Sequence, residues 1–375
     1  MSLAKFLHGQ EDVSSHGMQI PCFKHQAAIH AYYLTDEKRL LYRPDSNVPP
    51  MEHMEKSCAI SRFLNKSGWL KLAGPQNVSF LAAGEYNENH LIRAAEGCFV
   101  LRINHGSQLG LGPEQIEYEF RVLQALSGSG VTPKPLRVLR DAPGLGPVLL
   151  MDYLPGEALD YERDLELAAR ILAAVHAQPV PDDGLLIQAE PLREIARESL
   201  TLITRFDDHP LARTRDRLLR ASDEVMKLHL AHQDEFADEP MCLVNTEVNS
   251  GNFIVDRIAG QGWLVDWEKA VISCRYQDLG HFLAPTTTLW KTEQRIGPDD
   301  RQRFLGAYRE AAGLGIPLET IGHRTAILER AVLLRALSWC FMAYYEYTCQ
   351  DRVLTSQTTL ERIGRYLENM ECFLP

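Results

Sequence analysis

Three polar residues at fixed spacing constrain this chain more than any other feature of its sequence. Glu247 is followed five residues later by Asn252, and Asp266 lies fourteen residues beyond Asn252. Asn252 and Asp266 stand at the two ends of a short strand hairpin, whose second strand is the alternating run 263–265. Amide and carboxylate oxygens are the ligands that Mg²⁺ takes in proteins. The fold must therefore be built around a hairpin that carries an acid, an amide and a second acid.

Composition limits the class of protein. The chain has 375 residues, of which 45% are hydrophobic, so it can bury a sizeable core, and we expect two lobes. Its formal net charge is −11 and its pI is about 5.7. This balance argues against a nucleic-acid-binding surface and fits a cationic or neutral small substrate.

Cysteine, histidine and hydropathy patterns indicate the compartment. The eight cysteines are scattered without a Cys-x-x-Cys pair, which predicts neither a zinc knuckle nor a disulfide framework and fits a reducing cytoplasm. The thirteen histidines show no close metal-ligand cluster, so zinc chemistry is not expected. The first twenty residues lack the apolar run of a signal peptide, and no stretch reaches the roughly 18 apolar residues of a membrane span.

Hydrophobic periodicity predicts a strand-rich part followed by a helix-rich part, which is an α+β architecture. Short strands are expected at 78–82, 89–94, 98–103, 136–139 and 148–153, with a helix at 114–126 between the third and fourth. Beyond Gly156 the chain reads as mainly helical, most clearly at 165–176 and 324–347. We therefore expect an N-terminal extension over 1–75 with a helix at 51–64, a small lobe over 76–153 and a large lobe over 154–375.

At this point the chain resembles the aminoglycoside phosphotransferase and choline kinase branch of the protein-kinase-like superfamily. The resemblance rests on 245–252, which reads Asn-Thr-Glu-Val-Asn-Ser-Gly-Asn, and on Asp266-Trp267-Glu268. It implies a small antiparallel-sheet lobe and a mainly helical lobe with the substrate cleft between them. It also implies transfer of the γ-phosphoryl group of ATP, with Mg²⁺, to a hydroxyl of a small molecule.

In the small lobe, the resemblance implies a set of nucleotide-binding residues. Gly84 and Asn87 lie in the turn that covers the phosphates, and Arg102 takes the place of the phosphate-binding base. Glu119 in the following helix is implied as the partner of Arg102, with Glu117 as the competing candidate. The linker that meets the adenine is implied at 151–154, with Asp152 and Leu154 as the contacting residues.

The catalytic loop departs from the pattern typical of the family, which reads His-Gly-Asp-Leu-His-x-Gly-Asn. The resemblance makes Glu247 the catalytic acid and Asn252 and Asp266 the metal ligands, with Asn252 completing the catalytic loop. Glu in place of Asp adds a methylene, which displaces the carboxylate by roughly 1 Å unless the backbone compensates. Asp278 matches the buried acid that braces the loop, and a helix N-cap is the alternative.

Two other interpretations stay open. The altered loop fits a pseudokinase that binds a nucleotide without turning it over and regulates a partner. The extension over 1–75 fits a partner-binding module. We expect a small-molecule hydroxyl substrate, and neither nucleic acid nor a membrane, as the partner of this chain.

Overall fold

The computed structural model describes residues 50–350 and 357–374, so most of the predicted N-terminal extension lies outside the described residues. The N-terminal lobe is a five-stranded antiparallel sheet in the order β1-β2-β3-β5-β4. Its strands are β1 (Val78–Ala83), β2 (Asn87–Ala94), β3 (Gly97–Asn104), β4 (Pro135–Ala142) and β5 (Gly146–Asp152). The antiparallel small lobe expected from the sequence is confirmed.

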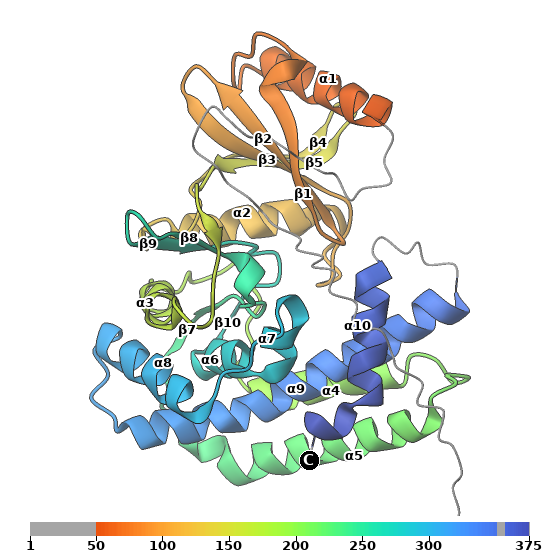
Figure 1. The fold of residues 1–375 in the computed structure, drawn as a ribbon, viewed down its shortest axis with the longest axis vertical. Helices are drawn as coiled ribbons and strands as arrows, with labels where there is room; N and C mark the ends of the chain where they lie inside the picture. The colour runs from red at the N-terminus through yellow and green to blue at the C-terminus, as the bar shows by residue number, and fades with distance from the viewer. Residues whose placement is uncertain (1–49, 351–356, 375) are drawn as a thin grey trace, which may run out of the picture. The chain divides into compact units, whose positions relative to one another are not determined.

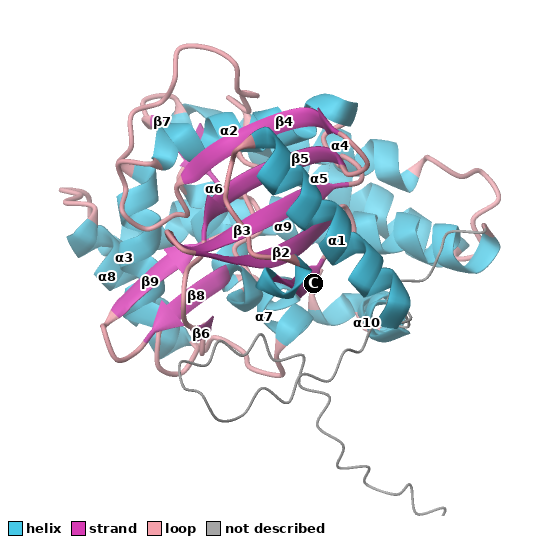
Figure 2. Ribbon diagram, turned by 90° about the horizontal axis from the view of Figure 1, so that it is seen from above, coloured by secondary structure: helices cyan, strands magenta, loops and turns pink. Residues whose placement is uncertain are grey.

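Two helices pack on this sheet (Figures 1 and 2). Helix α1 (Pro50–Ser67) places Ile60 and Leu64 in one hydrophobic cluster with Ile92 and Leu101 of the sheet. Helix α2 (Gln115–Leu126) belongs to the other cluster, which continues into the C-terminal lobe. The last part of the predicted extension is therefore built into the core of the small lobe.

The C-terminal lobe is mainly helical, as expected (Figure 1). Its helices are α3 (Leu165–His176), α4 (Pro191–Ile203), α5 (Ala212–Phe236), α6 (Tyr276–Leu283), α7 (Pro285–Lys291), α8 (Pro298–Ala311), α9 (Leu318–Cys349) and α10 (Gln357–Glu368). Helix α9 packs against α4, α5, α6, α8 and α10 and so forms the centre of this lobe. None of the helices within the described ranges combines the length and apolar content that crossing a bilayer requires.

Short strands carry the predicted site residues. Strand β7 (Met241–Val244) pairs with β10 (Val271–Cys274), and β8 (Phe253–Asp256) and β9 (Gln261–Leu264) form the predicted hairpin, with β6 (Glu157–Ala158) at its edge. Single 3₁₀ turns occur at Pro75–Asn77, Gly112–Glu114, Ser250–Asn252 and Met370–Cys372. Because the backbone N–H of Val265 donates to the Asn252 carbonyl at 2.8 Å, Asn252 and Asp266 lie side by side at one end of the hairpin.

We predict that α1 is required for the stability of the small lobe. Leu64→Ala removes a fully buried side chain and should lower the free energy of unfolding by about 2 to 5 kcal/mol, measured by denaturant titration. Met54→Ala on the same helix is the control, because Met54 is 61% exposed. Equal unfolding curves for Leu64→Ala and the unmutated protein would contradict the packing of α1 on the sheet.

Candidate active site

A buried carboxylate fixes the loop that follows β7. Asp278, in the first turn of α6, accepts hydrogen bonds from the backbone N–H groups of Asn245 and Thr246, both at 2.8 Å. Its side chain is fully buried and also lies 3.3 Å from Nε2 of His176. Arg275, not Asp278, occupies the N-cap position of α6. The geometry therefore favours the loop-bracing interpretation of Asp278 over the helix cap.

Two residues of the site have left-handed backbone conformations. Thr246 has φ 66° and Asp266 has φ 64°, and they are the only non-glycine residues with positive φ in the described chain. Such a conformation is rare for a β-branched residue such as Thr and costs of order 1 to 3 kcal/mol. Hydrogen bonds hold both: Thr246 Oγ1 donates to the Lys269 carbonyl at 3.0 Å, and Asn245 Nδ2 donates to the Asp266 carbonyl at 2.9 Å. Asn245 thus joins the two loops.

Three carboxylates converge next to these loops. Glu247, Asp266 and Glu268 each offer one oxygen, and the three oxygens lie within 4.8 Å of one another. Lys269 Nζ lies 3.1 Å from Glu247 Oε1. Hard cations such as Mg²⁺ bind to carboxylate oxygens, so the chemistry of this donor set fits a divalent cation.

Asn252 lies directly beside the carboxylates. Its side-chain nitrogen donates to the Glu247 carbonyl at 2.8 Å, which links the two predicted catalytic residues. Because the amide nitrogen is used in this bond, the amide oxygen is the atom that can bind a cation. The structure therefore brings together Glu247, Asn252 and Asp266, as their spacing suggested.

Arg102 connects the two lobes. Its Nη1 atom lies 2.6 Å from Glu119 Oε1 and 2.9 Å from Asp266 Oδ1, and its Nε donates to Asn89 Oδ1 at 3.0 Å. The other candidate partner, Glu117, pairs instead with Arg140 near the surface. Burial raises the pKa of Glu119, against the opposing charge of Arg102, whereas Glu119 and Asp266 raise the pKa of the Arg102 guanidinium. Arg102 thus keeps its charge at the boundary between the lobes.

Glu268 is a site residue that the sequence did not assign. Burial, followed by the negative charges of Asp266 and Glu247, raises its pKa to about 8. Asn87 Nδ2 donates to Glu268 Oε2, and Asn104 Nδ2 donates to Asn87 Oδ1 at 2.9 Å. Asn87 therefore ties the small lobe to the loop that carries Asp266 and Glu268, and the phosphate contact that the resemblance implied stays a prediction.

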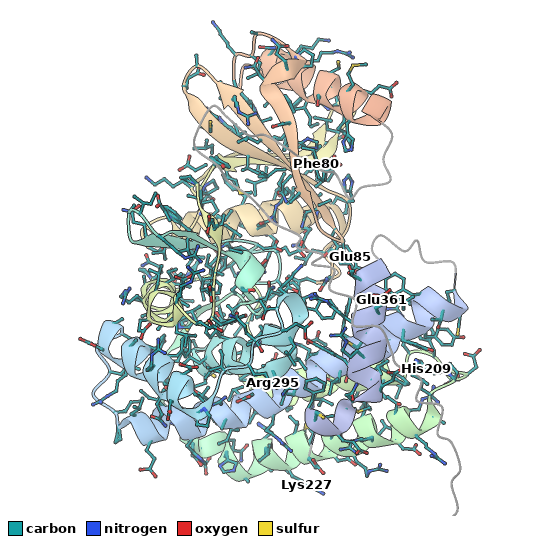
Figure 3. All side chains as sticks on the ribbon, in the orientation of Figure 1. Phe80, Glu85, His209, Lys227, Arg295 and Glu361 are labelled. Atoms are coloured by element: carbon teal, nitrogen blue, oxygen red, sulfur yellow. The ribbon has the colours of Figure 1, made fainter. Side chains whose placement is uncertain are left out.

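The remaining predicted nucleotide residues line the small lobe. Gly84 lies in the β1–β2 turn, where its N–H donates to the Asn87 carbonyl at 2.8 Å. The same turn carries Glu85, which Figure 3 labels. The Glu85 carboxylate accepts a hydrogen bond from Tyr347 Oη at 3.5 Å. Asp152 ends β5, and Leu154 follows in the connection to β6. These residues occupy the turn and the linker between the lobes, and their contacts with a nucleotide stay a prediction.

Lys269 and Glu268 could have been found from the sequence because they follow Asp266 within three residues. Two charged residues so soon after Asp266 are a sequence signal for a site. Only the left-handed backbone at Asp266 shows that the chain turns so that both side chains lie close to Glu247. His176 is different: it lies 102 residues from Asp278 and no sequence pattern connects the two. Its Nδ1 lies 2.8 Å from Tyr308 Oη, so a buried chain of polar groups supports Asp278.

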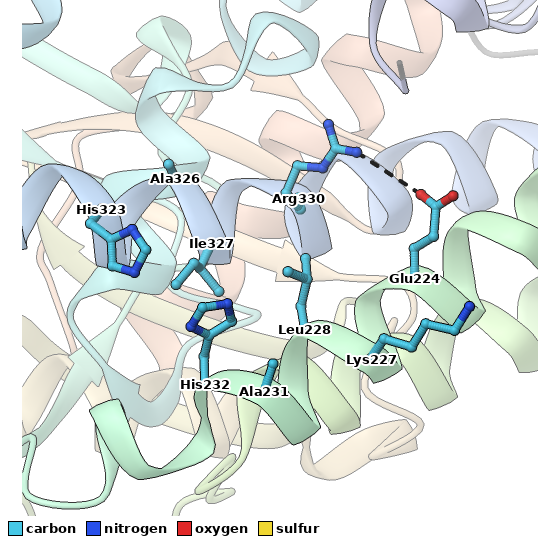
Figure 4. Close-up of a pocket in the computed structure, with 9 residues that line it drawn as sticks. All are labelled: Glu224, Lys227, Leu228, Ala231, His232, His323, Ala326, Ile327 and Arg330. Carbon is cyan, nitrogen blue, oxygen red and sulfur yellow. Dashed lines mark ion pairs between the residues drawn. The ribbon is translucent and has the colours of Figure 1, made fainter.

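The expectation that the histidines form no close metal-ligand cluster is wrong. His232 and Glu235 of α5 and His323 of α9 each offer one ligand atom within 4.8 Å of the others. The two histidines border a surface cleft of about 560 Å³ between α5 and α9, which Glu224 and Arg330 also line (Figure 4). The sequence could not show this cluster because packing of two helices far apart in the chain creates it. The residues lining the cleft include none of the site residues above.

Comparison with known families now decides the class. The sequence pattern of the phosphotransferase enzyme family matches residues 77–319, a range that includes the predicted site residues of both lobes. The chain belongs to the phosphotransferase enzyme family. It is therefore a phosphotransferase with the two-lobed, protein-kinase-like fold expected from the resemblance.

Solved structures share the fold of this phosphotransferase at low sequence identity. An ethanolamine kinase from Plasmodium vivax has a TM-score of 0.59 at 13% identity, covering 82% of this chain and 85% of that protein. A choline/ethanolamine kinase family protein from Mesorhizobium loti has a TM-score of 0.59 at 16% identity, covering 85% and 95%. An amicoumacin kinase has a TM-score of 0.56 at 18% identity, covering 85% and 96%. A comparison with curated protein sequences gives no match.

We predict that removing Arg102 destabilises this phosphotransferase more than removing both members of its buried pair. Arg102→Ala should lower the free energy of unfolding by about 3 to 5 kcal/mol, because Glu119 is left buried without its partner. The double variant Arg102→Met/Glu119→Leu should recover most of that loss in denaturant titrations. Arg140→Ala, which breaks a surface pair, is the control and should leave the melting temperature nearly unchanged. Equal losses in the single and double variants would contradict this account.

Proposed function

We propose that this phosphotransferase moves the γ-phosphoryl group of ATP, with Mg²⁺, to a hydroxyl group of a small molecule. The observation that carries the proposal is the convergence of Glu247, Asn252 and Asp266 at one end of the hairpin, with Arg102 reaching Asp266 from the other lobe. Phosphoryl transfer needs positioned charge more than covalent chemistry by the protein, and this arrangement supplies both signs of charge at one place.

Each residue has a proposed task. A bound Mg²⁺ would neutralise charge on the transferring phosphates, held by Asn252, Asp266 and Glu268. Arg102 would bind phosphate oxygens, for which its planar guanidinium is suited. The Glu247 carboxylate would orient the acceptor hydroxyl and accept its proton, while Lys269 beside it would offer positive charge to the transferring group.

The solved relatives support nucleotide and divalent cation use. The amicoumacin kinase was solved in complex with AMP-PNP and Ca²⁺, and a spectinomycin phosphotransferase with ADP. We propose the same lobe roles here, with 76–153 binding the nucleotide and 154–375 carrying the catalytic loop and the acceptor site. The cysteines of the described residues are all free, which supports a reducing, cytoplasmic location.

One observation favours a second candidate function, a nucleotide-binding pseudokinase. The presumed base is Glu instead of Asp, and its carboxylate is already paired with Lys269. A carboxylate held in that way could support binding without turnover. The role of the extension over 1–75 in partner binding stays a prediction, which its deletion with retained nucleotide binding would test.

Our prediction for the metal site is a Mg²⁺-dependent rise in melting temperature with ATP. Saturation at 100 times the dissociation constant stabilises a folded protein by about 2.7 kcal/mol. Asp266→Ala should abolish the Mg²⁺-dependent part of the rise, whereas Asp256→Ala, on the same hairpin and away from the carboxylates, should retain it. An unchanged Mg²⁺ response in Asp266→Ala would remove Asp266 from the metal site.

For the catalytic loop, we predict that Glu247→Gln lowers turnover by roughly 100-fold, in line with the loss of a general base. The affinity for ATP and the Mg²⁺ concentration at half-maximal rate should stay nearly constant in steady-state kinetics. If Glu247 is a metal ligand instead, that Mg²⁺ concentration will rise. Glu247→Asp should not be faster than the parent, because Asn245 and Thr246 hold the loop in the geometry that fits Glu. A faster Asp variant would favour the pseudokinase interpretation.

A further inference from the structure

A buried arginine next to the catalytic loop has no acidic partner within the described residues. Arg335 of α9 is 9% exposed, and its Nη2 donates to the Thr246 carbonyl at 3.2 Å and lies 3.4 Å from His281 Nδ1. Arginine has no acceptor atoms, so Nδ1 of His281 accepts this contact and the imidazole is neutral there. Burial, then the charges of Arg335 and Lys269, lower the pKa of His281 well below its usual range, which agrees with a neutral ring.

Other shielded arginines of this lobe and of the lobe boundary are neutralised by carboxylates. Arg102 pairs with Glu119 and Asp266, and Arg275 and Arg324 both pair with Glu239. A shielded charge without such a partner is costly, because the protein replaces the water around it with weaker contacts. The positive charge of Arg335 could therefore be neutralised by a bound anion.

A second cation lies near the other end of the same loop. Lys291 is the last residue of α7, and its side chain lies against Gly251. A side chain at position 251 would place its Cβ 3.6 Å from Lys291 Cε. It forms no ion pair with any acid that the structure describes, although the charges of Asp266 and Glu247 act on it. Its side chain is exposed, and desolvation, followed by the charge of Arg362 on α10, lowers its pKa.

Arg335 thus contacts the start of the segment 246–251, which carries Glu247, and Lys291 lies near the end of that segment. The chain as a whole has a net charge of −11, so two cations without an acidic partner in the described part of the chain run against its average. The carboxylates nearby do not neutralise them: Glu247 pairs with Lys269, and Asp266 pairs with Arg102. Arg335 and Lys291 therefore remain as two cations beside this loop without an acidic partner among the described residues, whereas the composition alone suggested a cationic or neutral substrate.

We propose that the acceptor of this phosphotransferase is an anionic hydroxyl compound, whose carboxylate or phosphate group binds to Arg335 and Lys291 beside Glu247. This inference rests on the proposed function of the same site. A charged hydrogen bond at each cation would fix the anion, and the hydroxyl group of the acceptor would then face the Glu247 carboxylate.

The test uses three alcohols that match in size and differ in charge. ADP release is measured with glycolate, ethylene glycol and ethanolamine, and a second pair compares ribose 5-phosphate with ribose. The anionic member of each set should have a kcat/KM at least about tenfold higher than its neutral and cationic counterparts, as expected for a charged hydrogen bond. A preference for ethanolamine would overturn the proposal.

Variants separate the anion from the nucleotide. Arg335→Gln keeps a donor for the Thr246 carbonyl but removes the charge, and Lys291→Ala removes an exposed side chain without a fold requirement. Both should raise the KM for the anionic acceptor by about tenfold and leave the KM for ATP nearly constant. If the KM for ATP rises as much, these cations serve the nucleotide phosphates instead. An Arg335→Gln variant with parental kinetics would show that Arg335 only supports the loop.

Arg330→Ala is the matched control. Arg330 lies on the same helix, five residues before Arg335, and points to Glu224 across the surface cleft at 4.0 Å (Figure 4). It should leave the preference for anions unchanged.

A binding experiment covers the case in which none of the five alcohols is turned over. Sulfate should bind to the protein saturated with Mg²⁺ and AMP-PNP in calorimetry, and Arg335→Gln should lose that binding. Tetramethylammonium should not bind. Absence of sulfate binding in the parent protein would overturn the proposal, whereas absence of any Mg²⁺-dependent response to ATP would instead overturn the proposed function.

Discussion

The site depends on one buried carboxylate that accepts two adjacent backbone N–H groups. Asp278 holds Asn245 and Thr246, and through them it fixes the left-handed turn at Thr246. A strained turn persists only where its surroundings determine it more strongly than its own preference does. Here those surroundings include His176 and Tyr308, which extend the polar contacts of Asp278 into the helical core. The orientation of the next residue, Glu247, follows from the contacts that hold Thr246.

In the catalytic loop, an asparagine side chain gives the support that a histidine gives in the family pattern. Where the family pattern has His, this chain has Asn245, whose side chain donates to the Asp266 carbonyl and accepts from the Glu247 N–H. One amide therefore sets the distance between the presumed base and the presumed metal ligand. Because its amide group donates and accepts at the same time, Asn245 can link the two loops. This connection gives the substitution at Glu247 a structural context.

The distribution of charge divides the site into two halves. On the side of the small lobe, Arg102 contacts both Glu119 and Asp266, so its charge has acidic partners. On the side of α7 and α9, Lys291 and Arg335 have no acidic partner among the described residues. Opposite charge at the right place gives specificity more than affinity, because the wrong substrate meets repulsion or leaves a charge unpaired. With the proposed function, the two halves would select different chemical groups.

The sequence by itself determined the order of the elements and the kind of chemistry. Alternating apolar residues gave the strands of the small lobe, and the run 165–176 gave α3 with its observed bounds. The spacing of Asn252 and Asp266 across a hairpin was enough to place them together, because a hairpin is a local structure whose ends must meet. The choice between Glu117 and Glu119 stayed open, since both lie on the same turn of one helix.

Only the tertiary structure decided which groups act on each other across long separations. It selected Glu119 for Arg102, built α1 into the small lobe, and brought His176 to Asp278 and Arg335 to Thr246. It also brought His323 of α9 to His232 and Glu235 of α5, which lie far from it in the chain. Local periodicity carries information on which face of an element is buried, but not on which distant element covers that face. Charges are neutralised or left unpaired by such contacts, so the electrostatics of the acceptor side could be read only from the folded chain.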